Sequence, residues 1–170
     1  MNVDVDYKNI LIAINFTDTS RLTFYVALKY ARSFDANLWV LHVTKPIDTF
    51  DGEGSVEKQA NEMARLEEGV KRRINELFES GGLREVDRRK VLIDFRAGDV
   101  ATEILHASVE RNIDLIVMGK NPEKRRGLKK LVSHSPAEKV VDKAQCHVLV
   151  VKPSDYRYTA ESIPEKFSNV

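Results

Sequence analysis

Five short apolar runs, rich in β-branched residues, constrain the fold of this 170-residue chain more than any other feature. The runs are Ile10–Ile14, Leu38–Val43, Val91–Phe95, Leu115–Met118 and Val148–Val151. They are mostly continuous rather than alternating, as expected of strands that are covered on both faces of a parallel sheet. Segments with helical spacing separate them at residues 21–34, at residues 56–79, after Asp99 and from Ser135. This order predicts an α/β fold, an open five-stranded parallel sheet with helices on both faces, in the doubly wound arrangement.

The charge and cysteine content exclude several classes of protein. The net charge is +1, so no global field draws the chain onto nucleic acid or a membrane, and we expect neither as a partner. The single cysteine, Cys146, forms no intramolecular disulfide, which fits a reducing cytoplasm. No signal-peptide core is visible, and no apolar run approaches the roughly 20 residues that span a bilayer. We therefore expect a cytoplasmic protein.

The length and the distribution of patterns predict one domain, over residues 1–153, followed by an extension over residues 154–170. The longest helical pattern stops at Gly81-Gly82, which is a suitable helix end. Thr44–Ser55 is polar and acidic, and it reads as a mobile connection. The extension has weak periodicity, so it does not predict a second domain.

Polar or small residues follow two of the expected strands. In a doubly wound sheet, ligands bind beyond the carboxyl ends of the strands, where the strand order reverses. Asn15 follows the first strand, and its side-chain amide could contact a base or a ribose. Alternatively, residues 15–20 only start and cap the next helix. Gly119 follows the fourth strand, where glycine either lets a ligand approach the backbone or simply ends the strand.

A strongly basic loop follows Gly119. Its cations include Lys120, Lys124, Arg125 and Arg126, and its only acidic residue is Glu123. Guanidinium groups and backbone amides in such a loop could hold phosphates, or the loop could dock an acidic protein partner. The alternative is a solvated surface loop, which most runs of charge are.

Ser135 begins a helical pattern with the sequence Ser135-Pro136-Ala137-Glu138. The S-x-x-E spacing predicts a capping box, with proline at the first helical position. A phosphate at this helix start would compete with the box for the same amides. Pro136 removes one amide donor, and Glu138 would repel the phosphate.

No arrangement of residues indicates a catalytic or metal site. The four histidines, at positions 42, 106, 134 and 147, lack a metal-binding spacing. A nucleophile elbow, a Walker loop and a dinucleotide-binding glycine motif are all absent. The residues therefore predict no hydrolase triad, no catalytic residue and no metal ligand, and they leave open whether the protein is an enzyme.

The chain resembles the universal stress protein family. The stretches that carry the resemblance are KNILIAINFTDTSRLTFYVALKYA, LWVLHV, FRAGDVATEILHASVERNIDLIVMG and GLKKLVSHSPAEKVVDKAQCHVLVVK. The resemblance implies a five-stranded fold like that of the adenine nucleotide alpha hydrolases and a role in stress tolerance. It also implies a homodimer through the last strand, here about Cys146 to Lys152. In one branch of the family it implies ATP binding, marked by G-x₂-G-x₉-G-[S/T] after the fourth strand.

The family's nucleotide motif is only partly present. Gly119 and Ser135 match it, whereas Pro122 and His134 stand where two glycines are expected, and the spacing is two residues longer. The resemblance places an apolar adenine pocket at Ala13, Asn15 and Val43, with Met118 beside Gly119, and Asn15 stands where the family usually has aspartate. The tentative nucleotide site is therefore the set Ala13, Asn15, Val43, Met118, Gly119 and Ser135.

Three functional hypotheses follow. The first is a non-enzymatic, dimeric stress-response protein with a degenerate nucleotide site and no certain cofactor. The second is a protein that binds ATP or another adenine nucleotide through Asn15, Gly119, Ser135 and the basic loop, with slow ATPase activity. The third is an interaction module whose basic loop docks an acidic protein.

Overall fold

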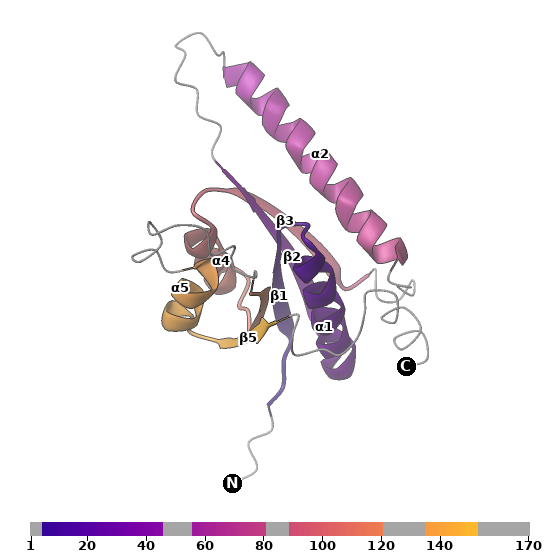
Figure 1. The fold of residues 1–170 in the computed structure, drawn as a ribbon, viewed down its shortest axis with the longest axis vertical. Helices are drawn as coiled ribbons and strands as arrows, with labels where there is room; N and C mark the ends of the chain where they lie inside the picture. Colours follow the sequence, from indigo (N-terminus) through magenta and orange to yellow (C-terminus); the bar gives the residue numbers. More distant parts are fainter. Residues whose placement is uncertain (1–4, 46–55, 81–88, 121–134, 153–170) are drawn as a thin grey trace.

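The computed structural model describes residues 5–45, 56–80, 89–120 and 135–152 (Figure 1). In chain order the elements are β1 (Asn9–Ile14), α1 (Asp18–Phe34), β2 (Asn37–Thr44), α2 (Val56–Ser80), β3 (Val91–Ala97), α4 (Val100–Glu110), β4 (Leu115–Gly119), α5 (Pro136–Lys143) and β5 (His147–Val151). Each of the five expected strands is present, with ends shifted by at most two residues. Helix α1 begins three residues before the apolar periodicity indicates, because its first turn is polar.

The strands form one sheet in the order β3-β2-β1-β4-β5, and every neighbouring pair is parallel. The chain adds β2 and β3 on one side of β1, and then crosses over to add β4 and β5 on the other. The predicted open, doubly wound α/β fold is confirmed. The strand order reverses between β1 and β4, so this is where the general rule for such sheets places a ligand.

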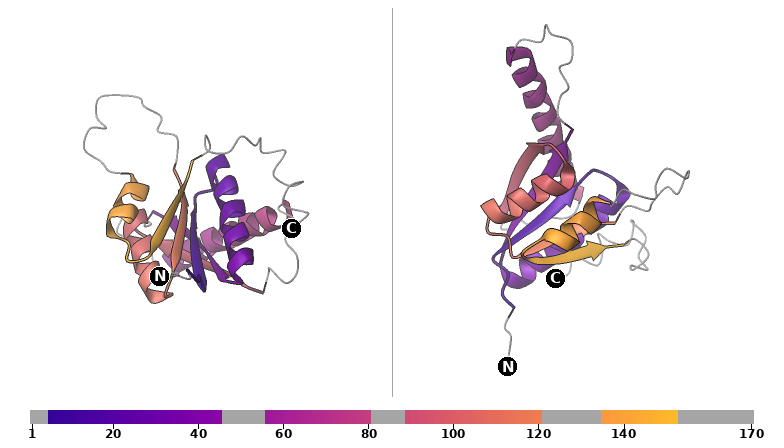
Figure 2. Two further views of the ribbon diagram at one scale, coloured as in Figure 1. Left: turned by 90° about the horizontal axis from the view of Figure 1, so that it is seen from below. Right: turned by 90° about the vertical axis from the view of Figure 1, so that its left-hand side faces the viewer.

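The helices in the described ranges cover both faces of the sheet (Figures 1 and 2). Helices α1 and α2 pack on the face that carries Ile10, Ile12 and Val40. Helices α4 and α5 pack on the opposite face, which carries Leu11 and Ile116. Because successive strand residues point to opposite faces, one strand supplies both cores, which is why its sequence is continuously apolar.

Two helix starts follow local sequence signals. Asp99 caps α4, and its carboxylate accepts a hydrogen bond from the backbone N–H of Thr102 at 3.0 Å. Ser135 caps α5 with the complete predicted capping box. The connection expected over Thr44–Ser55 begins later, because Thr44 is the last residue of β2. Its residues 46–55, the Gly81-Gly82 helix end and the extension over residues 154–170 lie outside the described residues.

Candidate functional site

Three apolar side chains of the tentative site lie on the α4/α5 face of the sheet, at its carboxyl edge. Ala13 of β1 is paired with Met118 of β4, and Val43 of β2 belongs to the same apolar cluster. Met118 is buried, whereas Ala13 and Val43 are only partly covered. The expected apolar wall therefore exists as a set of neighbours at the point where the strand order reverses.

Asn15 lies directly after β1, and its side-chain oxygen is used inside the β1–α1 turn. Asn15 Oδ1 accepts from the Thr17 hydroxyl at 2.8 Å, from the Thr17 backbone N–H at 3.4 Å and from the Ser20 hydroxyl. The Ser20 hydroxyl accepts in turn from the Asn15 backbone N–H at 3.0 Å. A backbone N–H can only donate, so the atom that faces the turn is the oxygen. Among the described residues, the hydrogen bonds of the Asn15 side chain use its oxygen, and its side-chain amide nitrogen donates to none of them.

Gly119 ends β4, and the space beside its Cα is taken by α1. A Cβ built at Gly119 would lie 2.7 Å from Thr19 Cγ2 and 2.8 Å from Thr23 Oγ1. Both threonines are buried. The missing side chain therefore lets helix α1 approach β4, on the face opposite the apolar wall. This packing accounts for the glycine without a ligand.

Ser135 and Glu138 use each other's hydrogen-bonding groups at the start of α5. The Ser135 hydroxyl accepts from the Glu138 backbone N–H at 3.3 Å, and the Glu138 carboxylate accepts from the Ser135 backbone N–H at 3.0 Å. A carboxylate of the protein itself therefore occupies the helix start where a phosphate would bind. Pro136 has no backbone N–H, so this end of α5 has few backbone donors left for a ligand.

The neighbouring charges at this edge are mostly paired. Hydrogen bonds from the backbone N–H and the hydroxyl of Thr102 hold the pKa of the Asp99 carboxyl below its usual value. Lys139 of α5 lies 3.8 Å from the same carboxylate. On β3, Arg96 contacts Glu110 at 2.6 Å, and this hydrogen bond raises the pKa of Arg96. Arg96 is therefore committed to the protein's own carboxylates.

The cationic part of the tentative site is mostly beyond the described residues. Lys120 is described and exposed. Lys124, Arg125 and Arg126 lie outside the described residues, as do Pro122 and His134. Within the part of the chain that the structure describes, no three His, Cys, Asp or Glu side chains are grouped to hold a metal ion. In that same part, no helix has the length and apolar character to cross a membrane.

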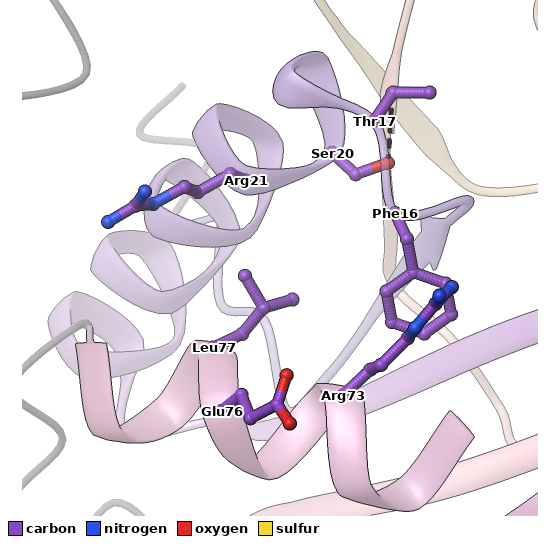
Figure 3. Close-up of a pocket in the computed structure, with 7 residues that line it drawn as sticks. All are labelled: Phe16, Thr17, Ser20, Arg21, Arg73, Glu76 and Leu77. Atoms are coloured by element: carbon purple, nitrogen blue, oxygen red, sulfur yellow. Dashed lines mark hydrogen bonds between the residues drawn. The ribbon is translucent and has the colours of Figure 1, made fainter. Parts of the chain in front are cut away.

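A pocket on the opposite face of the sheet was not predicted from the sequence. It has a volume of about 450 Å³ and lies between α1 and α2 (Figure 3). Its lining residues are Phe16, Thr17, Ser20, Arg21, Arg73, Glu76 and Leu77. No local signal could have found it, because α2 meets the start of α1 only through the order of the strands.

The aromatic residues next to this pocket come from two separate segments, the β1–α1 turn and β2. Phe16 has a left-handed backbone conformation with φ of 57°, and its ring centroid lies 5.0 Å from that of His42 on β2. His42 Nδ1 lies 2.9 Å from the backbone carbonyl oxygen of Ile14, so it donates to it. These contacts hold the β1–α1 turn on β2.

Comparison with known proteins identifies the family. The model of the universal stress protein family matches residues 6–152. The chain belongs to the universal stress protein family. A universal stress protein of Thermus aquaticus is 34% identical over 149 residues, covering 86% of this chain and 99% of the relative. One of Methanocaldococcus jannaschii is 29% identical over 148 residues, covering 86% of this chain and 82% of the relative.

Solved universal stress proteins share the fold. The universal stress protein UspA from Lactobacillus plantarum superposes with a TM-score of 0.62 at 22% identity, covering 87% of this chain and 99% of that one. A universal stress protein in complex with cAMP has a TM-score of 0.60 at 17% identity, covering 86% and 98%. One from Archaeoglobus fulgidus in complex with dAMP has a TM-score of 0.53 at 18% identity, covering 87% and 100%.

Proposed function

We propose that this universal stress protein is a non-enzymatic, dimeric regulatory protein of the stress response, with a degenerate nucleotide site. In this proposal the site at the ends of β1 and β4 contacts the adenine nucleoside and holds phosphates only weakly. The nucleoside would lie against Ala13, Val43 and Met118, and the side-chain amide N–H groups of Asn15 would donate to it.

The observation that carries the proposal is the capping box of α5. Its two hydrogen bonds use the Ser135 hydroxyl and the amides of Ser135 and Glu138. A phosphate that approached these amides would have to displace the Glu138 carboxylate, which is a negative charge already placed at the positive end of the helix. Phosphate groups should therefore contribute little to affinity at this helix start.

The complexes of related structures support an adenine-containing ligand. Their ligands, cAMP and dAMP, each carry a single phosphate, so a chain with this fold can hold an adenine nucleoside without a triphosphate. For the present chain we propose only that it likewise binds the adenine nucleoside part of a ligand. The apolar wall and the exposed Asn15 side chain provide the groups that such a ligand needs.

The second candidate is an ATP-binding protein with slow ATPase activity. It requires that side-chain charge from Lys120, Lys124, Arg125 and Arg126 replaces the missing glycine amides. Binding of this kind weakens as the salt concentration rises. The same cations also suit the third candidate, docking of an acidic protein.

The decisive experiment compares adenosine, AMP and ATP. The native protein is purified and denatured, released nucleotides are identified by mass spectrometry, and the three ligands are titrated by calorimetry. We expect affinities that agree within about tenfold, and no phosphate release from ATP above background. ATP binding hundreds of times tighter than adenosine would establish the second candidate instead. If no ligand binds or is released, the nucleotide hypothesis fails and partner docking remains.

We propose that dimerisation uses the outer edge of β5. In the sheet, β5 has β4 on one side and no described strand on the other. His147 N–H donates to Asp114 on the β4 side, and the Val151 carbonyl accepts from Lys120 there. Backbone groups alternate in direction along a strand, so those of Val148 and Val150 point away from the sheet. An exposed edge of this kind can pair with a second copy of itself.

A further inference from the structure

The β1–α1 turn fixes the orientation of the Asn15 side-chain amide. Asn15 Oδ1 accepts hydrogen bonds from the Thr17 backbone N–H, the Thr17 hydroxyl and the Ser20 hydroxyl. The Ser20 hydroxyl itself accepts from the Asn15 backbone N–H at 3.0 Å, so its own proton is available for Oδ1. If the amide were turned over, its NH₂ group would face the Thr17 backbone N–H, which can only donate. The turn therefore selects the orientation with the oxygen inward.

The two hydroxyl groups that hold the Asn15 oxygen lie close to each other. Thr17 Oγ1 and Ser20 Oγ are 3.4 Å apart (Figure 3). Ser20 belongs to the first turn of α1 and is buried, with 4% of its surface exposed. A buried side chain on a packed helix has little freedom to move, so the hydroxyl stays in place when a ligand arrives. Thr17 and Ser20 are therefore positioning residues for the Asn15 amide.

The side-chain nitrogen of Asn15 points away from the hydrogen bonds of the turn. The oxygen and the nitrogen of an amide lie on opposite sides of one carbon atom, so an inward oxygen leaves the NH₂ group outward. Asn15 is exposed. Side chains alternate between the two faces along a strand, so a residue two positions after Ala13 is expected on the same side of the sheet. The outward donor therefore adjoins the apolar wall of Ala13, Val43 and Met118.

A donor of fixed orientation distinguishes between the groups on the edge of adenine. The ring nitrogens of the base accept hydrogen bonds, whereas its exocyclic amine donates them. An exocyclic amine beside the Asn15 NH₂ group would leave two donors facing each other. A ribose hydroxyl can donate or accept, so a fixed donor gives no selectivity there. A base that lies flat on the apolar wall turns its edge toward Asn15.

We propose that Asn15 determines which edge of the base is bound, by donating from its NH₂ group to a ring nitrogen of adenine, and that Thr17 and Ser20 hold it in that orientation. This inference rests on the nucleoside site proposed above and adds the basis of its specificity. The exocyclic amine of adenine then lies away from Asn15. The ring nitrogens at purine positions 1, 3 and 7 share the same chemistry, and the experiment distinguishes them.

The test titrates the full chain with adenosine and with 1-, 3- and 7-deazaadenosine, each of which has C–H in place of one ring nitrogen. Calorimetry should show that one analogue binds about fivefold to tenfold more weakly than adenosine, because it lacks the acceptor. In ¹⁵N nuclear magnetic resonance, the side-chain NH₂ signal of Asn15 should shift with adenosine and much less with that analogue. This signal reports the contact and not the stability of the turn.

Asn15→Asp changes the outward group and keeps the turn. One carboxylate oxygen can accept the same hydrogen bonds from Thr17 and Ser20, while the other replaces the outward donor with an acceptor. Adenosine should bind about tenfold more weakly, and the weak analogue should then bind as adenosine does. Asn61→Asp is the matched control, because it makes the same change at an exposed position of α2 and should leave both affinities unchanged. Tighter binding of adenosine by Asn15→Asp would overturn the proposal, because the ligand would then present a donor.

The positioning residues are tested by combining Thr17→Val with Ser20→Ala. Without the two hydroxyl groups the amide can turn over, so the ratio of the two affinities, adenosine over analogue, should fall severalfold. A role in stability alone would lower both affinities by the same factor. Thr17→Val alone serves as the test if the double variant does not fold, since Thr17 is exposed.

The outcomes separate this inference from the proposed function. If adenosine binds but no deaza analogue differs from it, or if the ratio is the same in all variants, the role of Asn15 is wrong and the nucleoside site stands. If adenosine does not bind at millimolar concentration, the nucleoside site and the role of Asn15 both fail.

Discussion

Thr19 of α1 lies against Gly119 of β4, so closely that a methyl group on Gly119 would be 2.7 Å from Thr19 Cγ2. The two residues are a hundred positions apart and meet because β4 is next to β1 in the sheet. The sequence leaves open whether Gly119 faces a ligand or simply ends the strand. Its contact with α1 gives it a packing role on the opposite face.

Gly119→Ala is expected to destabilise the protein by about 1–3 kcal/mol, since α1 would have to move away from β4. The free energy of unfolding in urea measures this. Gly69→Ala is the control, because nothing lies within 4 Å of a Cβ at Gly69 in α2. That change should stabilise the helix by about 0.5–1 kcal/mol. Adding Thr19→Ser to Gly119→Ala should recover part of the loss, and no recovery would argue against the contact.

Substitutions in the capping box should separate helix stability from phosphate binding. Ser135→Ala removes the cap and should cost about 1 kcal/mol in the free energy of unfolding. Glu138→Gln keeps the box geometry and removes the charge. It should leave stability nearly unchanged while increasing affinity for ATP more than for adenosine, as measured by calorimetry. Equal changes for both ligands would mean that the phosphates do not approach α5.

Asp114 holds the start of β1 on the sheet. Its Oδ2 accepts from the backbone N–H groups of Lys8 and Asn9, each at 2.8 Å. Asp114→Ala should lower the free energy of unfolding by about 1–2 kcal/mol, because both amides lose a charged acceptor. Asp142→Ala, at an exposed site on α5, should change it by less than about 0.5 kcal/mol. Similar urea midpoints for the two variants would contradict this role.

The cap of α4 should make stability depend on acidity. Hydrogen bonds from Thr102 lower the pKa of Asp99 in the folded state, so its contribution is present above the unfolded value of about 3.9 and is lost as the pH falls through the lowered pKa. The stability difference between the natural chain and Asp99→Ala should be constant above about pH 5 and narrow below about pH 4. Asp99→Asn keeps a capping side chain, so at neutral pH it should lower the free energy of unfolding by less than Asp99→Ala does. Urea titrations at several pH values would test this, and a constant difference down to pH 2 would argue against it.

A proline in β5 should test the proposed dimer. The Val150 N–H points away from β4, so Val150→Pro removes an outward donor and leaves the pairing with β4 intact. Light scattering should then report a monomer with a native circular dichroism spectrum. Leu149→Pro is the contrasting variant, because its N–H faces β4 and its loss should unfold the strand. A folded Val150→Pro dimer would place the interface elsewhere.

The features that the sequence predicted correctly depend on neighbours along the chain. Strands such as Ile10–Ile14 show in the sequence as continuous apolar runs because both faces are covered. The cap at Ser135 acts over three residues, so the S-x-x-E spacing reveals it. The polar first turn of α1 has no such periodicity, so the predicted helix began too late.

The sequence by itself determined the α/β fold, the family and the local caps, because periodicity and capping act within a few residues of each other. Only the tertiary structure decided that Gly119 accommodates Thr19 and Thr23, and that Arg21 and Arg73 line one pocket. Those relations depend on the sheet order β3-β2-β1-β4-β5, which brings distant segments together through packing that no short stretch of sequence encodes.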